Sequence, residues 1–443
     1  MLDRSYFQNL GLEEVLDKVL AGERLSVDNG LSLYTCPEPH ALGLLASHVR
    51  EGLHHDRVHY VINRHVNPTN ICVNDCVFCA YRREPDAPDA YVLTAEQALE
   101  KLGQAGRVDE VHIVGGCHPT LKLSYYEDLC RRVRQALPQA SIKALTAVEV
   151  AHLAGVEQTS VTNVLARLKA AGVDMMPGGG AEIFAEALRA KLCPAKINGR
   201  EWLAVMGQAH HLGLASNATM LFGHVESLQD RLEHMDALRL QQDQTHGFKC
   251  FIPLPYLAQN NPLGRQALGP SGPDVLRTTA VARLMLDNFP HIKAYWVMLG
   301  LKLAQLCLSY GADDLDGTVV EEHIGHEAGS ASAQALTIPE LEQAIRAAGF
   351  TPVRRNGLFE EADGALPRTP LGEMISPRPP RTRAVEAWGE PPLAHKAHVR
   401  GGLGEIISPS ECRAEPCLGC PSTRPGGWLT RPRCTSWGRW PIG

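Results

Sequence analysis

Three cysteines lie close together in the segment Cys72-Val73-Asn74-Asp75-Cys76-Val77-Phe78-Cys79. Because their spacing is C-x₃-C-x₂-C, three thiolates can converge on one centre from a single loop. Three thiolates cannot complete four-thiolate ligation, so one iron of a 4Fe–4S cluster would keep an open position at which chemistry can occur. We expect Phe78 to lie against this cluster and to limit the access of solvent. The alternatives are three buried thiols or a zinc site with a distant fourth ligand, although zinc sites favour a second cysteine pair or a histidine nearby.

A glycine pair follows the cysteines by one strand and one helix. The apolar run Glu110–Val114 predicts a buried strand, and it ends in Gly115-Gly116-Cys117-His118-Pro119. Glycine lets a ligand approach the backbone closely, where a side chain would block it. A Gly-Gly turn alone indicates little, but its place after the cysteine motif makes it a candidate binding turn.

These motifs need a scaffold that positions them. The apolar pattern of the sequence predicts a fold in which strands and helices alternate. Strands are predicted at 59–66, 110–114, 142–146, 173–176, 214–220, 248–252 and 292–297. Helices are predicted at 125–137, 161–171, 202–211, 228–244 and 276–288, and two more begin at Thr94 and Thr337. This alternation is typical of an α/β fold with parallel strands, and the glycine or polar residues at the strand ends favour a full or partial barrel over a doubly wound sheet. Residues 1–57 are predicted to be an N-terminal helical extension, and residues 58–355 the barrel with its C-terminal completion.

The end of the chain differs in composition. Residues 361–443 hold 13 of the 30 prolines, ten arginines and a single lysine, without a sustained apolar period. Such a segment buries too little surface to offset chain entropy, so we expect a disordered or irregular tail, or one translated from an unselected reading frame. Its four cysteines are either a second metal site or part of that tail: Cys412, Cys417, Cys420 and Cys434.

Charge and hydropathy exclude several classes of protein. The net charge of −6 argues against a nucleic-acid partner, since such proteins usually carry a basic excess. We find no apolar run of the length that a membrane span needs, and the N-terminus places acidic residues where a signal peptide has basic and apolar ones. A cytoplasmic enzyme with a small-molecule substrate is expected.

The motif C-x₃-C-x-φ-C, with φ the aromatic Phe78, resembles that of the radical S-adenosylmethionine (radical SAM) superfamily when it follows the first strand of a β/α repeat. The resemblance implies a TIM-like full or partial (β/α) barrel and a 4Fe–4S cluster held by Cys72, Cys76 and Cys79. It also implies that S-adenosylmethionine binds the open iron, that Gly115 and Gly116 contact its methionine moiety, and that reduced flavodoxin or ferredoxin donates the electron.

Further motifs are similar to the menaquinone and deazaflavin branch of this superfamily, and to its aminofutalosine synthase family in particular. They are Asn67–Cys72, Thr146–Glu149, Pro177–Glu182, Ser216–His224 and Asp313–Glu322. The resemblance covers about residues 1–355. It implies a transferase for which S-adenosylmethionine is a substrate. The 5′-deoxyadenosyl radical adds to 3-[(1-carboxyvinyl)oxy]benzoate, and rearrangement and decarboxylation give 6-amino-6-deoxyfutalosine for menaquinone biosynthesis.

For several individual residues the resemblance implies a functional role, and each of them also has a structural alternative. Glu149 and Glu182 can accept hydrogen bonds from the ribose or the ammonium group of S-adenosylmethionine, or each can be the acidic cap of a helix. His118 binds a substrate carboxylate or moves a proton, or it is a turn residue before Pro119. Asn217 is expected to point into the barrel, as a catalytic or a structural polar contact.

Other charged residues receive no catalytic role. A dicarboxylate substrate needs a facing cation, which the sequence does not identify. Arg277 and Arg283 are interpreted as surface or salt-bridge residues of a helix. The run Asp313, Asp314 and Asp316 is interpreted as a loop with helix caps, and Cys117 is left without a role.

Three rival functions stay open at this point. One is the cyclase of the same pathway that acts on dehypoxanthine futalosine and shares the cysteine triad. Another is the deazaflavin-forming homologue that acts on tyrosine. The third is a non-catalytic iron–sulfur redox protein, although such carriers normally have a fourth thiolate ligand.

Overall fold

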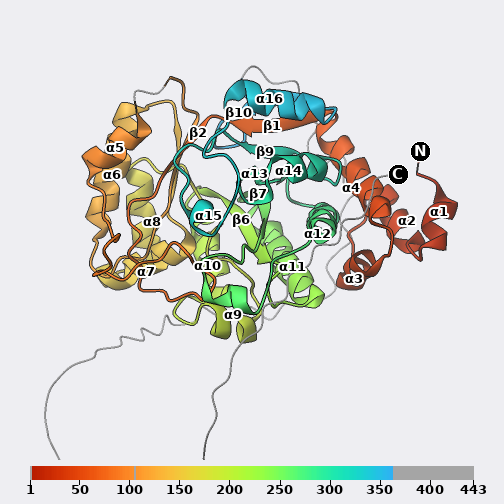
Figure 1. Cartoon of the computed structure of the whole chain (residues 1–443), viewed down its shortest axis with the longest axis horizontal. Coiled ribbons are helices and arrows are strands. Elements are labelled where there is room, and N and C mark those ends of the chain that lie inside the picture. The colour runs from red at the N-terminus through yellow and green to blue at the C-terminus, as the bar shows by residue number, and fades with distance from the viewer. Residues whose placement is uncertain (1, 104–105, 363–443) are drawn as a thin grey trace, which may run out of the picture. The chain divides into compact units, whose positions relative to one another are not determined.

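A computed structural model describes residues 2–103 and 106–362 (Figure 1). At its centre is a seven-stranded parallel sheet. Its strands, in spatial order, are β2 (Asn63–Val66), β3 (Glu110–Ile113), β4 (Ser141–Ala144), β5 (Met175–Met176), β6 (Ala215–Phe222), β7 (Phe248–Pro255) and β8 (His291–Ile292). A second parallel sheet has the order β10 (Thr351–Arg355), β1 (Arg57–Val61) and β9 (Asp314–Gly317).

Both edges of the larger sheet meet β9 or the residues just after it. Lys293 forms a parallel bridge with Asp314, and Arg64 forms one with Val320. The curved sheet is therefore a partial barrel whose gap β9 occupies. The predicted α/β class and barrel architecture are confirmed for the described residues.

Helices cover the outer face of the sheet, as Figure 1 shows. Four precede the first strand, and α4 packs against α12 while α3 packs against α11. These four are α1 (Arg4–Asn9), α2 (Glu13–Ala21), α3 (Val27–Thr35) and α4 (Pro39–His54). The others are α5 (Ala95–Leu102), α6 (Leu123–Ala136), α7 (Ala147–Glu157), α8 (Val161–Ala170), α9 (Glu186–Leu192), α10 (Gly199–His211), α11 (Leu228–Thr245), the 3₁₀ turn Pro262–Arg265, α12 (Gly272–Met285), α13 (Trp296–Leu299), α14 (Leu301–Leu308), α15 (Ile324–Glu327) and α16 (Ile338–Ala347). None of the helices in the described ranges has the length and apolar character to cross a bilayer.

Several element predictions were wrong in detail. The strand predicted at 59–66 is two strands, because β1 pairs with β10 and β9 whereas β2 pairs with β3. The strand predicted at 292–297 ends at Ile292, since the chain turns into α13, where the indole of Trp296 donates a hydrogen bond to the carbonyl of Gly317. The elements that were not predicted are α7, α9, the 3₁₀ turn Pro262–Arg265, α13, α14, α15, β9 and β10. The tail from residue 363 onward, with its four cysteines, lies outside the described residues.

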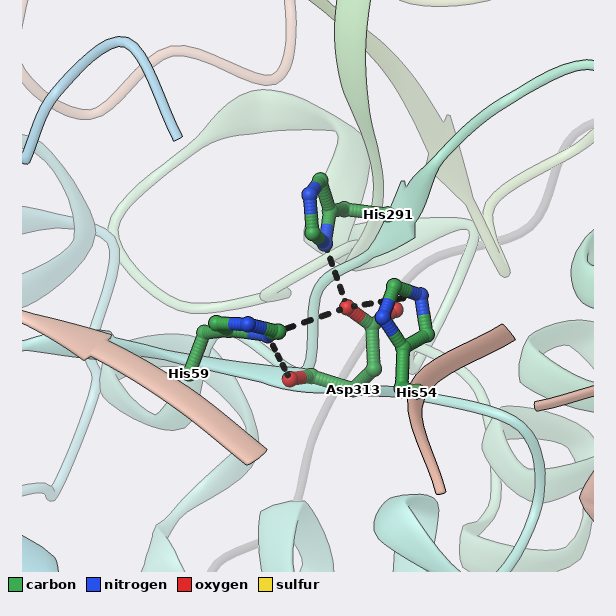
Figure 2. Close-up of side chains that lie close together, drawn as sticks. All are labelled: His54, His59, His291 and Asp313. Atoms are coloured by element: carbon green, nitrogen blue, oxygen red, sulfur yellow. Dashed lines mark hydrogen bonds and ion pairs between the residues drawn. The ribbon is translucent and has the colours of Figure 1, made fainter. Parts of the chain in front are cut away.

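The run Asp313–Asp316 is not a loop with caps, as predicted, because Asp313 lies just before β9, Asp314–Asp316 belong to this strand, and all of these residues are buried. Asp313 accepts hydrogen bonds from Arg283 at 2.5 Å, from His291 at 2.5 Å and from the amide of Ile292 at 2.8 Å. Figure 2 shows the rings of His54, His59 and His291 around this carboxylate. Arg283 is 1% exposed, so it is a buried ion-pair partner and not a surface residue.

This arrangement is a hydrogen-bond network that joins elements distant in sequence. Burial favours the neutral carboxyl, but the histidines outweigh it and hold the pKa of Asp313 well below its usual value. Three histidines and an aspartate are also the composition of a zinc site. Here, however, donors already occupy both carboxylate oxygens, and the Arg283 guanidinium balances the charge. We therefore assign the network a structural role, which is to fix β8 and β9 to one another.

Candidate functional site

One cavity of about 320 Å³ opens at the carboxyl ends of the strands, where parallel α/β sheets place their ligands. It brings together nearly all of the side chains singled out in the sequence. Its lining includes Cys72, Cys76, Phe78, Cys79, Gly115, Gly116, Glu149, Glu182 and Asn217. His118 is not among the lining residues.

The cysteine loop follows β2 and places its three thiols at the cavity wall. Cys72 accepts a hydrogen bond from the amide of Cys117 at 3.3 Å, and hydrogen bonding from Cys117 lowers the pKa of the Cys72 thiol to about 5. Burial raises the pKa of Cys76 to about 12, against the pull of the nearby Lys196. Thiols beside a cation and hydrogen-bond donors are suited to bind metal as thiolates, with proton release on binding.

Lys196 is the main residue of this site that sequence reasoning missed. Its ammonium pairs with Glu182 at 2.6 Å and lies 5.3 Å from the centre of the Phe78 ring. Burial disfavours ionisation of Glu182, but Lys196 outweighs burial and lowers the pKa of this carboxyl. Lys196 lies in the loop between α9 and α10, where no motif marks it.

The glycine pair has a packing role in addition to the ligand contact that the sequence predicts. A Cβ atom at Gly116 would lie 2.2 Å from the carbonyl oxygen of Ile71, and one at Gly115 would lie 2.8 Å from that of Thr69. Both glycines therefore let the turn after β3 pack directly on the chain that leads into the cysteine loop. They also line the cavity.

Replacing Gly116 by alanine is expected to displace the cysteine loop, because the added methyl group meets backbone and not a flexible side chain. Overpacking of this kind costs about 1–3 kcal/mol. Denaturant unfolding should show this loss, and iron bound per chain after anaerobic reconstitution should fall with it. Gly155→Ala on α7 is the matched control, since nothing lies within 4 Å of a Cβ there. Equal iron content in the two variants would contradict this packing role.

Glu149 combines the two alternatives considered for it. One carboxylate oxygen accepts hydrogen bonds from Thr146 at the start of α7, which completes a capping box. The other accepts from the amide of Gly115 at 3.0 Å, at the cavity wall. Burial raises the pKa of Glu149 to about 7 despite these donors. Burial thus opposes ionisation of this carboxyl group, whereas its donors favour it.

The two remaining predicted residues differ in placement. Asn217 on β6 is 2% exposed, lines the cavity, and its Oδ1 has no hydrogen-bond partner within the described chain. His118 instead uses Nδ1 to accept from the amides of Thr120 and Leu121. Its position favours the turn alternative. Cys117 lines the cavity, and both a hydrogen bond to Cys72 and burial raise the pKa of its thiol well above the usual value.

Comparisons with known proteins fit this geometry. A family model described as the radical SAM superfamily matches residues 66–238, and one described as the CofH/MqnC C-terminal region matches residues 245–366. A Thermus thermophilus protein named aminodeoxyfutalosine synthase is 44% identical to the chain, over 78% of this chain and 95% of the relative. A Streptomyces coelicolor protein of the same name is 39% identical, over 84% and 99%.

Relatives named for another activity are nearly as similar. A Methanopyrus kandleri protein named 5-amino-6-(D-ribitylamino)uracil–L-tyrosine 4-hydroxyphenyl transferase is 38% identical, over 79% of this chain and 97% of the relative. Among solved structures, methylornithine synthase (PylB) matches with a TM-score of 0.61 at 18% identity, over 76% and 97% of the two chains. The hydrogenase maturase HydG of Carboxydothermus hydrogenoformans matches with a TM-score of 0.62 at 17% identity, over 80% and 82%. At such identities the structural likeness concerns the fold alone.

Proposed function

Because the chain belongs to the radical SAM superfamily, in the family that includes the aminodeoxyfutalosine synthases, we propose that it is itself such a synthase. It transfers the adenosyl group of S-adenosylmethionine to 3-[(1-carboxyvinyl)oxy]benzoate. Rearrangement and loss of a carboxylate then give 6-amino-6-deoxyfutalosine, an intermediate on the futalosine route to menaquinone. The observation that carries this proposal is the 44% identity over 95% of a synthase, together with a cavity that gathers the motif residues.

The residues at the cavity wall fit a 4Fe–4S cluster. Cys72, Cys76 and Cys79 are free thiols that line one cavity, and Lys196 favours their ionised forms. Cys117 lies outside the cysteine loop, in the turn after β3, and its amide donates a hydrogen bond to Cys72, so we do not count it as a fourth ligand. When bound, the cluster supplies the electron and the open iron at which S-adenosylmethionine is cleaved.

The chain's own residues then bind and orient the two substrates. Glu149, which accepts a hydrogen bond from Gly115 in the turn after β3, and Glu182, which follows the glycine run after β5, both line the cavity and offer acceptors to the ammonium group and the ribose of S-adenosylmethionine. Asn217 also lines the cavity and offers a carbonyl oxygen that has no hydrogen-bond partner among the described residues. Phe78 and Cys117 close the wall beside the cysteines and restrict water there. We propose reduced flavodoxin or ferredoxin as electron donor and the cytoplasm as the place of reaction, as the superfamily's need for one low-potential electron suggests.

A panel of substrates tests the proposal. The full chain, reconstituted anaerobically with iron and sulfide and then reduced, is supplied with S-adenosylmethionine and one of three partners. These are the enol-ether benzoate, dehypoxanthine futalosine, and L-tyrosine with 5-amino-6-(D-ribitylamino)uracil. We expect only the first to be consumed, with a product that contains adenine. Consumption of the second or third alone would assign the chain to a cyclase or to the tyrosine transferases. Failure to cleave S-adenosylmethionine at all would favour a redox protein.

A further inference from the structure

Beyond the cysteine loop, the inner part of the cavity is lined by polar side chains from three neighbouring strands. His65 on β2 is in register with His112 on β3, and His112 is in register with Lys143 on β4. The centres of the two imidazole rings lie 4.6 Å apart. All three side chains line the cavity, so they form one continuous polar layer across its floor.

One ring nitrogen of each histidine in this layer has no hydrogen-bond partner among the described residues. Nε2 of His65 and Nε2 of His112 are buried without a hydrogen-bond partner within the described chain. His65 as a whole is only 5% exposed. An unsatisfied buried polar group costs about 1–3 kcal/mol, and such groups are typically kept where a ligand satisfies them. Both side chains line the cavity, but the two nitrogens themselves are shielded, so a ligand contacts them after a small movement of the rings.

The fixed charges around the floor already balance one another. Lys143 pairs with Glu110 at 2.6 Å, Lys293 pairs with Asp316 at 2.8 Å, and Arg355 pairs with Asp314 at 2.5 Å. Each cation of these pairs is therefore already neutralised by a carboxylate, and none of them is left to balance the charge of an anion that enters this region. The additional positive charge that it needs can come from a proton on an imidazole.

We propose that His65 and His112 bind the ring carboxylate of the benzoate substrate and that one proton is taken up from solvent as it binds. This inference rests on the proposed function. It identifies the facing cation that a dicarboxylate substrate requires and that the sequence does not reveal.

The surroundings of the two histidines agree with this proton uptake. Burial lowers the pKa of His65 and lowers that of His112 further, so both are neutral before the ligand binds. The charged groups that face His65 are Glu322, Asp316, Glu110 and Lys143, and those that face His112 are His65, Lys143, Asp316 and Lys293. A carboxylate in hydrogen-bond contact stabilises the charged imidazole and raises its pKa toward and above neutrality.

The direction of the substrate follows from the order of residues along the strands. His112 precedes Gly115 by three residues, which span at most about 10 Å of extended chain, so the histidines lie below the glycine turn by no more than this distance. The vinyl group must face the cysteines and the glycine turn, because it receives the adenosyl group. The ring carboxylate is the polar group farthest from the vinyl carbon, so it points to the floor. Tyr295 and Ile252, which also line the cavity, are available to the aromatic ring.

The test compares two ligands by anaerobic calorimetry, on the full chain with its cluster oxidised so that no turnover occurs. The ligands are the enol-ether benzoate and 2-phenoxyprop-2-enoate, which lacks the ring carboxylate. We expect the analogue to bind the wild-type protein about 10–100-fold more weakly, the range for charge-assisted hydrogen bonds. Titrations in two buffers of different ionisation enthalpy should show about one proton taken up with the benzoate and none with the analogue. Equal affinity for the two ligands, or no proton uptake, would overturn the inference.

Variants locate the effect at the two histidines. His112→Gln and His65→Gln should each weaken the benzoate about 10-fold or more and leave the affinity for the analogue within about threefold. His210→Gln is the control, since this half-buried histidine bonds to Thr245 and Ser216 outside the cavity. If the variants weaken both ligands equally, the histidines only support the fold. If the wild-type protein binds neither ligand and does not consume the benzoate, the proposed function itself is wrong. The comparison of ligands on wild-type protein needs no variant, so it holds even where a variant misfolds.

Discussion

Replacing any one of Cys72, Cys76 and Cys79 by alanine is expected to reduce adenosyl transfer to the uncatalysed background, a loss of at least about 1,000-fold. All three thiols line the same cavity, and two remaining thiolates cannot hold a cluster with a single open iron. The direct measurement is iron per chain after anaerobic reconstitution, with turnover of the enol-ether benzoate measured on the same samples. Wild-type protein should bind about four iron atoms, and each variant far fewer.

The matched control is Cys130→Ala. Cys130 is a free, 1%-exposed thiol on α6 that does not line the cavity. Its removal should leave iron content and turnover close to those of the wild type, with a small loss of stability from the cavity left behind. If a variant of the triad kept its iron and its turnover, that cysteine would not be a ligand, and the assignment of the cluster to this loop would be wrong.

The second large effect concerns the network around Asp313, and it is one of stability. Arg283→Met is expected to lower the free energy of unfolding by about 3–5 kcal/mol, because it leaves a fully buried carboxylate without its guanidinium partner. Such a loss is a large share of the stability of an ordinary domain. Urea unfolding followed by circular dichroism should show a lower midpoint with an unchanged slope.

An exposed ion pair provides the comparison. Arg132 pairs with Glu96 at 2.6 Å, but both side chains are largely exposed, so Arg132→Met should change stability by less than about 1 kcal/mol. The double variant Arg283→Met with Asp313→Asn should recover part of the loss, since it also removes the buried charge. An effect of Arg283→Met as small as that of Arg132→Met would show that the network does not hold β8 and β9 together.

Much of the site was predictable because its residues follow directly after strands. The carboxyl ends of parallel strands meet at one edge of a sheet, so motifs that follow β2, β3, β4 and β5 converge there even when they are far apart in sequence. Cys72, Gly115, Glu149 and Glu182 were found in this way, and all of them line the cavity. His118 was not distinguished from them, because only the fold reveals that its ring accepts hydrogen bonds within a turn and does not line the cavity.

The rest depends on pairing between distant segments. The sequence Asp313-Asp314-Leu315-Asp316 has the composition of an exposed loop. It can be buried only because cations from other elements pair with its carboxylates, namely Arg283, Lys293 and Arg355. Likewise, nothing local shows that His65 and His112 share a level of the barrel. Their proximity follows from the register between β2 and β3, which sequence periodicity does not specify.

The most direct test of the transferase assignment is the fate of the adenosyl carbons. S-Adenosylmethionine labelled with ¹³C in its ribose is supplied to the reduced, reconstituted full chain together with the enol-ether benzoate, and the products are resolved by mass spectrometry. The proposed reaction places the label in an adenine-containing product that has also gained the benzoate ring. If the label appeared only in free 5′-deoxyadenosine, with the benzoate ring unattached, the chain would not be an adenosyl transferase.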